Sequence, residues 1–200
     1  MFTGIIEAQG VIVSVKRNDT NTTFIIESEI SAQLMPDQSL SHDGVCLTIE
    51  GVAHNRHQVT AVAETLSKTS LANWTPGYKV NIERSLSTNG RLDGHFVQGH
   101  IDATGKCLNI INKSGSWEFT FTFPDRFASL IIEKGSIAVN GISLTAYMVS
   151  RNSFNVAIIP YTWVHTNLSA LNEGDVVNIE FDMLGKYLNR ILSLKTENAL

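Results

Sequence analysis

Two short stretches of the sequence resemble each other and differ at their most reactive atom. Residues 43–48 read DGVCLT and residues 140–145 read NGISLT, so the thiol of Cys46 stands where the second stretch has the hydroxyl of Ser143. A single cysteine in an apolar run commonly acts as a small buried hydrophobic residue. Because a wholly apolar site rarely accepts a hydroxyl without a partner, the exchange of Cys for Ser indicates two polar pockets of different reactivity.

The segment GHFVQGHID contains two histidines, His95 and His100. On a strand their spacing puts them on opposite faces, and no Cys, Asp or Glu completes a recognisable ligand set, so we expect no shared metal. A surface position or a satisfied core position fits at least one of them. His100 follows Gly99, whereas the equivalent pair in the first half is Gly4 and Ile5. Since histidine transfers protons near neutral pH, His100 is the candidate for proton transfer.

The two hexapeptides belong to an internal repeat with an offset of 97 residues. Upstream, with a shift of two residues, TGIIEAQG (3–10) resembles QGHIDATG (98–105). The matching pairs are Gly44 and Gly141, Leu47 and Leu144, Thr48 and Thr145, Thr65 and Thr162, Thr69 and Thr166, Leu71 and Leu168, Gly77 and Gly174, and the VNIE of 80–83 and of 177–180. The repeat predicts two homologous domains, 1–88 and 96–187, followed by a C-terminal extension.

The elements that would hold these residues are mostly short strands. SWEFTFTF (116–123) alternates apolar and polar residues, which is typical of a half-buried strand. Further β-branched runs bounded by turn residues lie at 11–15, 23–27, 45–49, 58–63, 79–83 and 137–145. About six short strands per half favour a small closed or nearly closed barrel. Weak helical periodicity predicts a short helix in each half, at 64–74 and at 161–171.

The extension 183–194, MLGKYLNRILSL, differs from both repeats. Its apolar residues fall at helical spacing and form one face: Leu184, Tyr187, Leu188, Ile191 and Leu192. Such a helix either folds back on its own chain or pairs with copies of itself, and the residues alone leave both alternatives open.

The composition is that of an ordinary globular protein, with 43% hydrophobic and 17% charged residues in 200. A net charge of −4 without clustered Lys and Arg argues against a nucleic-acid surface. There is no apolar run of membrane-spanning length and no secretory-signal pattern, so we expect a cytoplasmic protein with no membrane contact. In that compartment Cys46 and Cys107 are expected to be free thiols. The sequence has no dinucleotide, P-loop or GxSxG motif.

The motifs MFTGIIE, DGVCLT, ETL, VNIER, GHFVQGHID, KGSIAVNGISLT, IPYT and VNIEFD closely resemble, in this order, the α-type riboflavin synthases. The resemblance covers residues 1 to about 190 and implies an all-β chain of two tandem homologous six-stranded Greek-key barrels. It implies that the C-terminal helix, 183–194, holds a homotrimer together, and so favours self-association. The N-terminal barrel of one subunit would then face the C-terminal barrel of its neighbour to form the active site.

The reaction of this family transfers a four-carbon unit between two molecules of 6,7-dimethyl-8-ribityllumazine, giving riboflavin and 5-amino-6-ribitylamino-uracil, without cofactor or metal. Two copies of one substrate require two similar pockets, and their different fates require chemical differences between them. The resemblance also suggests an association with lumazine synthase. The alternative is a non-catalytic carrier, since lumazine proteins share the architecture but have lost much of the Cys, His, Ser and Thr set.

The resemblance implies specific site residues. The N-barrel pocket would use Gly4, Ile5, Ile6, Cys46, Leu47, Thr48, Thr60, Ala61, Val62, Ala63, Glu64 and Thr65. The C-barrel pocket would use Gly99, His100, Ile101, Lys134, Ser143, Leu144, Thr145, Ile159, Pro160, Tyr161, Thr162, Trp163 and Val164. For catalysis we expect His100 to transfer protons, with Cys46, Ser39, Ser143, Thr145 and Asp182 assisting addition and elimination. The sequence departs from the family pattern at Asp43, where Asn is common, and at Tyr161, where a carboxylate is common.

Overall fold

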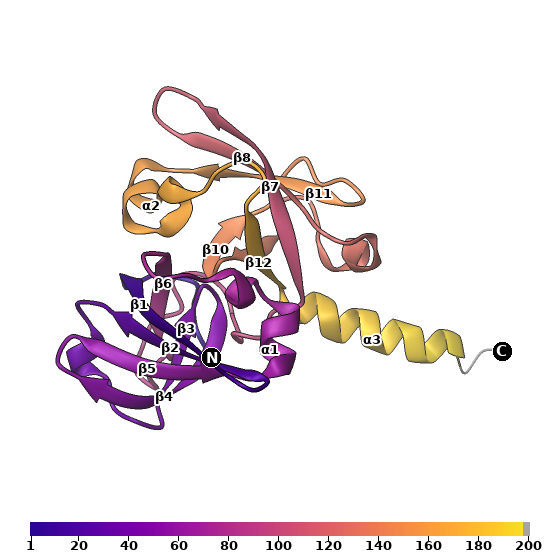
Figure 1. Cartoon of the computed structure of the whole chain (residues 1–200). Helices are drawn as coiled ribbons and strands as arrows, with labels where there is room; N and C mark the ends of the chain where they lie inside the picture. Colours follow the sequence, from indigo (N-terminus) through magenta and orange to yellow (C-terminus); the bar gives the residue numbers. More distant parts are fainter. Residues whose placement is uncertain (198–200) are drawn as a thin grey trace.

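The computed structural model describes residues 1–197, and its first half is a closed six-stranded barrel (Figure 1). The strands run around the barrel in the order β1-β2-β5-β4-β3-β6, and β6 pairs with β1 to close it. Their bounds are β1 Ala8–Asn18, β2 Asn21–Glu27, β3 Ser39–His42, β4 Val45–Ala53, β5 Arg56–Ala61 and β6 Lys79–Arg84. A single turn of 3₁₀ helix, η1 (Ser31–Gln33), connects β2 to β3.

The second half repeats this Greek-key order as β10-β9-β12-β7-β8-β11. In the described part of the chain, 1–197, the edge strands β10 and β11 do not pair directly, and an isolated bridge from Tyr147, just after β10, to Asn155 of β11 leaves this barrel nearly closed. Its strands are β7 Ala103–Asn112, β8 Trp117–Thr122, β9 Ser136–Val139, β10 Ile142–Thr145, β11 Ser153–Ile158 and β12 Val176–Phe181, with the 3₁₀ helix η3 at Asp125–Leu130. The predicted fold class, two tandem six-stranded barrels and a C-terminal helix, is therefore confirmed.

The predicted strand over 137–145 is in fact a hairpin. Asn140 and Gly141 have φ values of 46° and 77°, which are the left-handed values of a tight hairpin turn between β9 and β10. Asp43 and Gly44 make the same turn between β3 and β4, with φ values of 47° and 81°. The repeated Asp-Gly and Asn-Gly dipeptides are thus the turns that bring the Cys46 and Ser143 strands into register.

Each predicted helix is two shorter helices separated by a repeated threonine. In the first half α1 (Ala63–Lys68) precedes η2 (Ser70–Asn73), and in the second half α2 (Pro160–His165) precedes η4 (Asn167–Ala170). The hydroxyl of Thr69 donates to the Thr65 carbonyl at 2.7 Å and accepts from the Leu71 amide at 3.3 Å. Thr166 bonds to its equivalent neighbours in the same way. These bonds explain why threonine and leucine recur at these places in the repeat.

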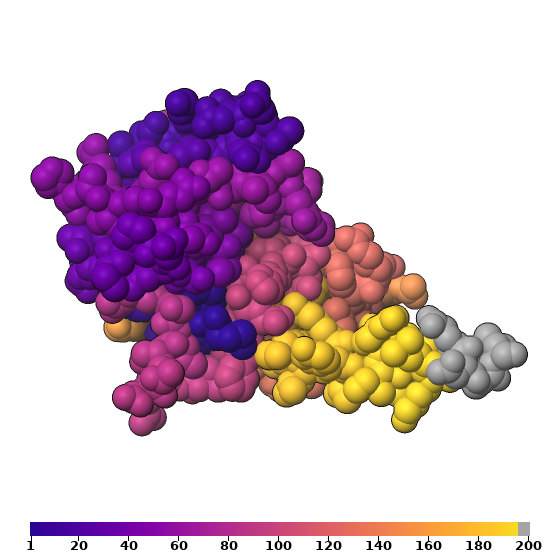
Figure 2. Space-filling view, turned by 90° about the horizontal axis from the view of Figure 1, so that it is seen from below, coloured from indigo at the N-terminus to yellow at the C-terminus, as the bar shows by residue number. Residues whose placement is uncertain are grey.

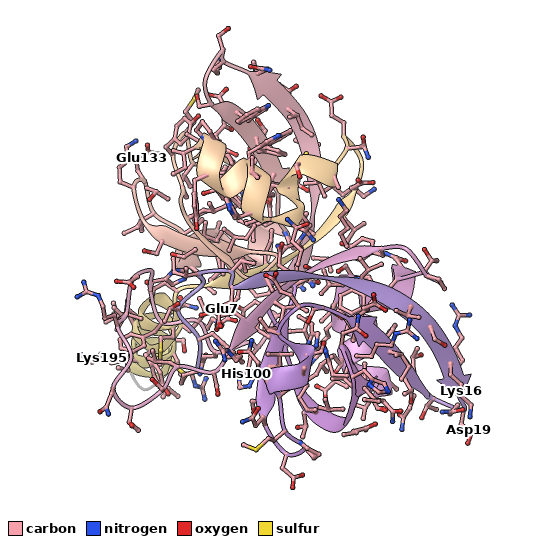
Figure 3. The ribbon with its side chains drawn as sticks, turned by 90° about the vertical axis from the view of Figure 1, so that its left-hand side faces the viewer. Glu7, Lys16, Asp19, His100, Glu133 and Lys195 are labelled. Atoms are coloured by element: carbon pink, nitrogen blue, oxygen red, sulfur yellow. The ribbon has the colours of Figure 1, made fainter. Side chains whose placement is uncertain are left out.

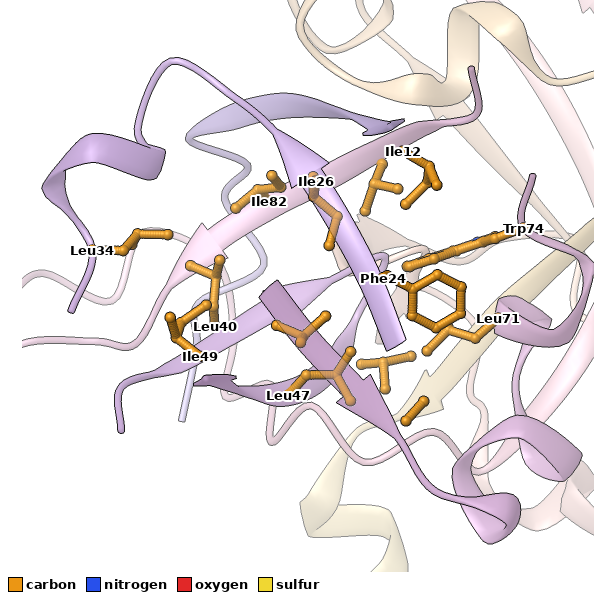
Figure 4. Packing of buried hydrophobic residues seen from close by; sticks show 14 of the residues in the cluster. Ile12, Phe24, Ile26, Leu34, Leu40, Leu47, Ile49, Leu71, Trp74 and Ile82 are labelled. Atoms are coloured by element: carbon orange, nitrogen blue, oxygen red, sulfur yellow. The ribbon is translucent and has the colours of Figure 1, made fainter. Parts of the chain in front are cut away.

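Apolar side chains of alternating strand positions fill each barrel. In the first barrel Phe24, Ile26 and Ile49 point inward and are wholly buried (Figure 4). In the second barrel the alternation read in 116–123 places Phe119 and Phe121 in the core. The burial of alternate positions confirms the half-buried strand predicted there.

A buried polar network joins the two barrels. Asn81 Nδ2 of the first barrel donates to the Asn140 carbonyl at 3.0 Å and to Asn167 Oδ1 at 2.8 Å. In the reverse direction Asn178 Nδ2 donates to the Asp43 carbonyl at 3.0 Å. Because directional hydrogen bonds cross the junction both ways, they set how one barrel sits on the other.

Helix α3 (Met183–Glu197) projects away from the barrels (Figures 1 and 2). Its contacts with its own chain include a hydrogen bond from Ser129 Oγ to Asn189 Oδ1 at 3.3 Å, near η3. Its predicted apolar face is largely exposed, with 67% of Leu184 and 63% of Tyr187 accessible. The alternative in which this face folds back on the chain is therefore wrong. Among residues 1–197, no helix has the length and apolarity needed to cross a membrane.

Candidate functional site

Two extended segments cross between the barrels beside the Cys46 and Ser143 strands. We call residues 2–7 strap 1 and residues 97–102 strap 2. The straps pair with each other through an antiparallel bridge between Phe2 and Val97. The carbonyl of Gly4 in strap 1 accepts from the Ser143 amide at 2.8 Å, and the carbonyl of Gly99 in strap 2 accepts from the Cys46 amide at 2.9 Å. Each strap is therefore bound to a strand end of the barrel to which it does not belong.

Glycine is required at both crossing points. Gly4 and Gly99 have φ values of +77° and +83°, which are strained for other residues. A Cβ atom on Gly4 would lie 2.6 Å from Ser143 Cβ, and one on Gly99 would lie 2.5 Å from Cys46 Cβ. These contacts are too close for any side chain, so the repeated glycines let strap and strand backbones meet.

This crossing corrects the predicted grouping of the pocket residues. Gly4, Ile5 and Ile6 were expected beside Cys46, and Gly99, His100 and Ile101 beside Ser143; both groupings are wrong. Ile6 packs against the core of the second barrel, and Ile101 packs against the core of the first. The repeat shows which residues are equivalent, but it contains no signal for the barrel that each strap reaches.

Two buried carboxylates that the sequence reading did not select hold the straps. Glu83 at the end of β6 accepts from the Thr3 amide at 2.6 Å and from the Gly4 amide at 3.0 Å. Glu180 in β12 accepts from the amides of Gln98, Gly99 and His100 at 2.7, 2.9 and 3.0 Å. Burial raises the pKa of both carboxyls, and the amide donors oppose that rise. The sequence feature that could have identified Glu83 and Glu180 is the repeated VNIE motif, which ends in these two residues.

The second barrel has a cavity of about 430 Å³ at the Ser143 strand. Six of the predicted binding residues line it, together with Tyr147 and Ala157: Lys134, Ser143, Leu144, Thr145, Ile159 and Thr162. Lys134 Nζ lies 5.0 Å from the centre of the Tyr147 ring, within the range of a cation–π contact. The cavity thus combines apolar walls with hydroxyls and one cation.

Ser143 has a histidine partner, His95, the histidine that was not selected for proton transfer. His95 Nδ1 lies 2.7 Å from Ser143 Oγ, and only 8% of His95 is exposed. Burial lowers the pKa of His95, while the negative charge of Asp182 acts in the opposite direction. Asp182 Oδ1 also accepts from the Leu184 amide at 2.9 Å and so caps helix α3. His95 and Ser143 form a hydrogen-bonded pair, and the charge of Asp182 acts on His95. The repeat did not reveal this pair, and the sequence feature that could have indicated it is the presence of His95 in the same segment as His100.

His100 lies on strap 2 with its side chain exposed, and its position is labelled in Figure 3. The first barrel presents the half-buried Cys46 next to Gly99 on this strap. Ser39 and Thr48 pair across β3 and β4 and are both exposed. The structure therefore brings His100 and Cys46 to one side of the junction and His95 and Ser143 to the other.

The predicted pocket residues at the end of β5 (60–65) and of β11 (159–164) differ in their exposure and contacts. In the first, Val62, Ala63 and Glu64 are exposed, whereas Ala61 is buried. Thr60 Oγ1 donates to Glu50 Oε2 at 2.9 Å.

In the second stretch, Trp163 stacks on Trp117 with ring centres 4.1 Å apart and packs against the core. Tyr161 and Val164 line a pocket together with Ile6 and Glu7 of strap 1. Strap 1 therefore lies beside the second barrel at this point too.

The two cysteines are both free, as expected, but their surroundings differ. Cys107 is buried in the second barrel core, and burial raises the pKa of its thiol to about 11. Cys46 is half-buried at the strand end that meets strap 2. Since a thiol must be accessible to react, the half-buried Cys46 rather than the buried Cys107 is the cysteine available for chemistry.

Comparisons with known proteins agree with this architecture. The family model described as lumazine binding domain matches twice, over residues 3–85 and 98–182. The riboflavin synthase of Bacillus amyloliquefaciens is 38% identical over all of this chain and 93% of its own length, and that of Actinobacillus pleuropneumoniae is 37% identical over 98% and 91%.

Among solved structures, LumP complexed with riboflavin has a TM-score of 0.85 at 22% identity, covering 90% of this chain and 99% of LumP. LumP complexed with 6,7-dimethyl-8-(1'-D-ribityl) lumazine has a TM-score of 0.83 at 21% identity, with the same coverage. These two likenesses concern the fold. With its two lumazine-binding domains and its full-length relatives above 30% identity, the chain belongs to the riboflavin synthase family of enzymes.

Proposed function

We propose that the protein converts two molecules of 6,7-dimethyl-8-ribityllumazine into riboflavin and 5-amino-6-ribitylamino-uracil, the last step of riboflavin biosynthesis. The observation that carries the proposal is the pair of equivalent crossing points, one at Cys46 and one at Ser143, which differ in thiol and hydroxyl. The relatives named riboflavin synthase and the structural likeness to a lumazine complex support the same substrate. Four carbons leave one molecule and complete a ring on the other, so the reaction needs no external oxidant.

Each proposed pocket combines a strand end of one barrel with the strap of the other. The first would use Gly99, His100 and Ile101 with Cys46, Leu47, Thr48 and Thr60 to Thr65. The second would use Gly4, Ile5 and Ile6 with Lys134, Ser143, Leu144, Thr145 and Ile159 to Val164. A volume of about 430 Å³ lies within the usual range for a ligand the size of a substituted pteridine. Backbone amides suit the donors and acceptors of the ring, and the hydroxyls suit the ribityl chain.

The chemistry requires loss of a proton from the C7 methyl group of one lumazine and nucleophilic addition to the ring of the other. We assign proton transfer to His100, and the assistance of addition and elimination to Cys46, Ser39, Ser143, Thr145 and Asp182. The hydrogen bond between His95 and Ser143 supports a role for that hydroxyl as a proton donor or acceptor during addition and elimination. Holding the two rings face to face would supply up to about 7–11 kcal/mol of the barrier reduction.

We propose that residues 1–88 and 96–187 act as the two lumazine-binding domains of a cytoplasmic homotrimer. The exposed apolar face of helix α3 supports assembly through residues 183–194. The active site would then lie between the N-terminal barrel of one subunit and the C-terminal barrel of its neighbour. Lumazine synthase, whose product is the substrate, is the proposed partner enzyme.

Incubation with dimethylribityllumazine should produce flavin absorbance in repeated turnovers. Tight binding without turnover would instead identify a carrier like the lumazine proteins, the second candidate, since the same fold accommodates a lumazine in LumP. His100→Gln should lower kcat far more than substrate affinity. An unchanged rate would remove His100 from the mechanism, and His95→Gln then tests the other histidine.

A further inference from the structure

Helix α3 makes an ion pair with strap 2. Lys186 Nζ lies 2.6 Å from Asp102 Oδ2, and the two side chains are only 23% and 19% exposed. The same oxygen of Asp102 accepts from the Phe181 amide at 2.9 Å, so the carboxylate is anchored to the end of β12 as well. Because both partners are largely shielded from water, the pair is less weakened by solvent than an ordinary surface ion pair.

The equivalent carboxylate of strap 1 is neutralised differently. Glu7, which the repeat pairs with Asp102, accepts from the Arg84 amide at 2.9 Å and makes an ion pair with the Arg84 guanidinium at 2.6 Å. Arg84 belongs to β6, so the cation that pairs with the carboxylate of strap 1 comes from the barrel to which this strap belongs. The residue equivalent to Arg84 in the second half is Phe181, which has no charge. The second strap therefore takes its cation from helix α3.

Lys186 acts on Asp102 of strap 2 and on Glu180, the carboxylate that holds this strap. Besides pairing with Asp102, its charge stabilises the ionised form of Glu180, and so favours the state that accepts the amides of Gln98, Gly99 and His100. The chain of contacts then continues from Gly99 to the Cys46 amide in the first barrel. Figure 3 labels Glu7 and His100, one residue of each strap, and Lys195 near the end of the helix.

We propose that Lys186 is a positioning residue through which helix α3 holds strap 2, and with it His100, against the Cys46 side of the site. The role of strap 2 in turnover rests on the proposed function, whereas the coupling between helix and strap does not. The position of His100 then depends on helix α3, whose exposed apolar face is the proposed assembly surface.

Amide hydrogen exchange tests the coupling without any activity measurement. In Lys186→Met the amides of Gln98, Gly99 and His100 should exchange about 5- to 30-fold faster, while those of Thr3 and Gly4 stay unchanged. Lys186→Arg should restore wild-type exchange because it keeps the cation. Arg84→Met should show the reverse pattern, with faster exchange in strap 1 only. Lys195→Met on the same helix is the control and should alter neither strap.

Kinetics then test the consequence for the site. Lys186→Met should lower kcat about tenfold with a smaller change in KM, and Lys186→Arg should recover most of it. Unchanged exchange in strap 2 of Lys186→Met would overturn the proposal, as would faster exchange over the whole chain, which indicates general destabilisation. If wild-type protein showed no turnover, the proposed function would fail, while the exchange pattern would still decide the coupling.

Discussion

Asp43→Asn should stabilise the protein, and increasingly so as the pH rises. Asp43 is wholly buried at the barrel junction, where Oδ1 accepts from the Asn81 amide at 2.7 Å and Oδ2 accepts from the Tyr78 hydroxyl at 3.1 Å. Burial raises its pKa from 3.8 to about 7. Asn140, at the equivalent place, is a neutral amide whose Oδ1 accepts from the Asn178 amide at 2.8 Å. An asparagine at 43 can therefore keep the main hydrogen bond and the left-handed turn.

The direction and magnitude of this pH dependence follow from the linkage between protonation of Asp43 and folding. Between pH 3.8 and 7 the unfolded chain has released the Asp43 proton but the folded protein retains it, so stability falls as the pH rises through this window. A pKa difference of about 3 corresponds to about 4 kcal/mol at full effect. From pH 5 to pH 8 the advantage of Asp43→Asn over the wild type should grow by about 2–3 kcal/mol.

Urea denaturation at pH 5, 6, 7 and 8, at one fixed protomer concentration, measures this difference. Asp37→Asn is the matched control, because Asp37 has a similar left-handed backbone (φ 70°) but an exposed side chain. Between pH 5 and pH 8 the stability difference from the wild type should change more for the buried Asp43→Asn than for the exposed Asp37→Asn. A pH-independent difference for Asp43→Asn would refute the reasoning, since it would mean that Asp43 ionises with the same pKa in the folded and unfolded states.

Three further predictions concern other parts of the chain. His42 and His57 lie buried with their Nε2 atoms 2.9 Å apart, and burial lowers the pKa of both, that of His57 to about 4. The stability that depends on neutral His57 is therefore complete above pH 6.5 and should fall by about 3 kcal/mol as the pH drops to 4; His57→Asn should flatten this limb of the urea-derived stability curve. Gly99→Ala should lower the free energy of unfolding by about 1–3 kcal/mol and remove most of the turnover, because the new methyl group would lie 2.5 Å from Cys46 Cβ. Unchanged stability by calorimetry and unchanged rates would exclude a close crossing of strap 2 and the Cys46 strand. A chain ending at Asp182 should sediment as a monomer and lose activity, and a trimer of that length would show that assembly does not use helix α3.

Much of the fold was predictable because the duplication left its matches at structurally obligatory places. The Asp-Gly and Asn-Gly turns, the capping pair Thr69 and Thr166, and the VNIE strands all recur at one offset. Alternation of aromatic residues in β8 predicted its buried face directly. These features depend on local geometry, which short sequence patterns record well.

The arrangement of the site was less predictable because it depends on long-range contacts. Nothing in the repeat indicates that strap 1 binds at Ser143 and strap 2 at Cys46, since both assignments satisfy the same residue pairing. His95 was passed over for His100 because its partner, Ser143, lies 48 residues further along the chain. Glu83 and Glu180 look like ordinary strand-end carboxylates until the amides that they accept are known.

The stoichiometry of the reaction tests most directly whether two identical ligands are treated differently by the two pockets. Purified protein is incubated with dimethylribityllumazine alone, and lumazine, riboflavin and 5-amino-6-ribitylamino-uracil are quantified over time by chromatography. We predict that two lumazines disappear for each riboflavin and each uracil product formed, over many turnovers. Lumazine that is bound in proportion to protein but recovered unchanged would contradict catalysis. Riboflavin formed without the uracil product would contradict the dismutation.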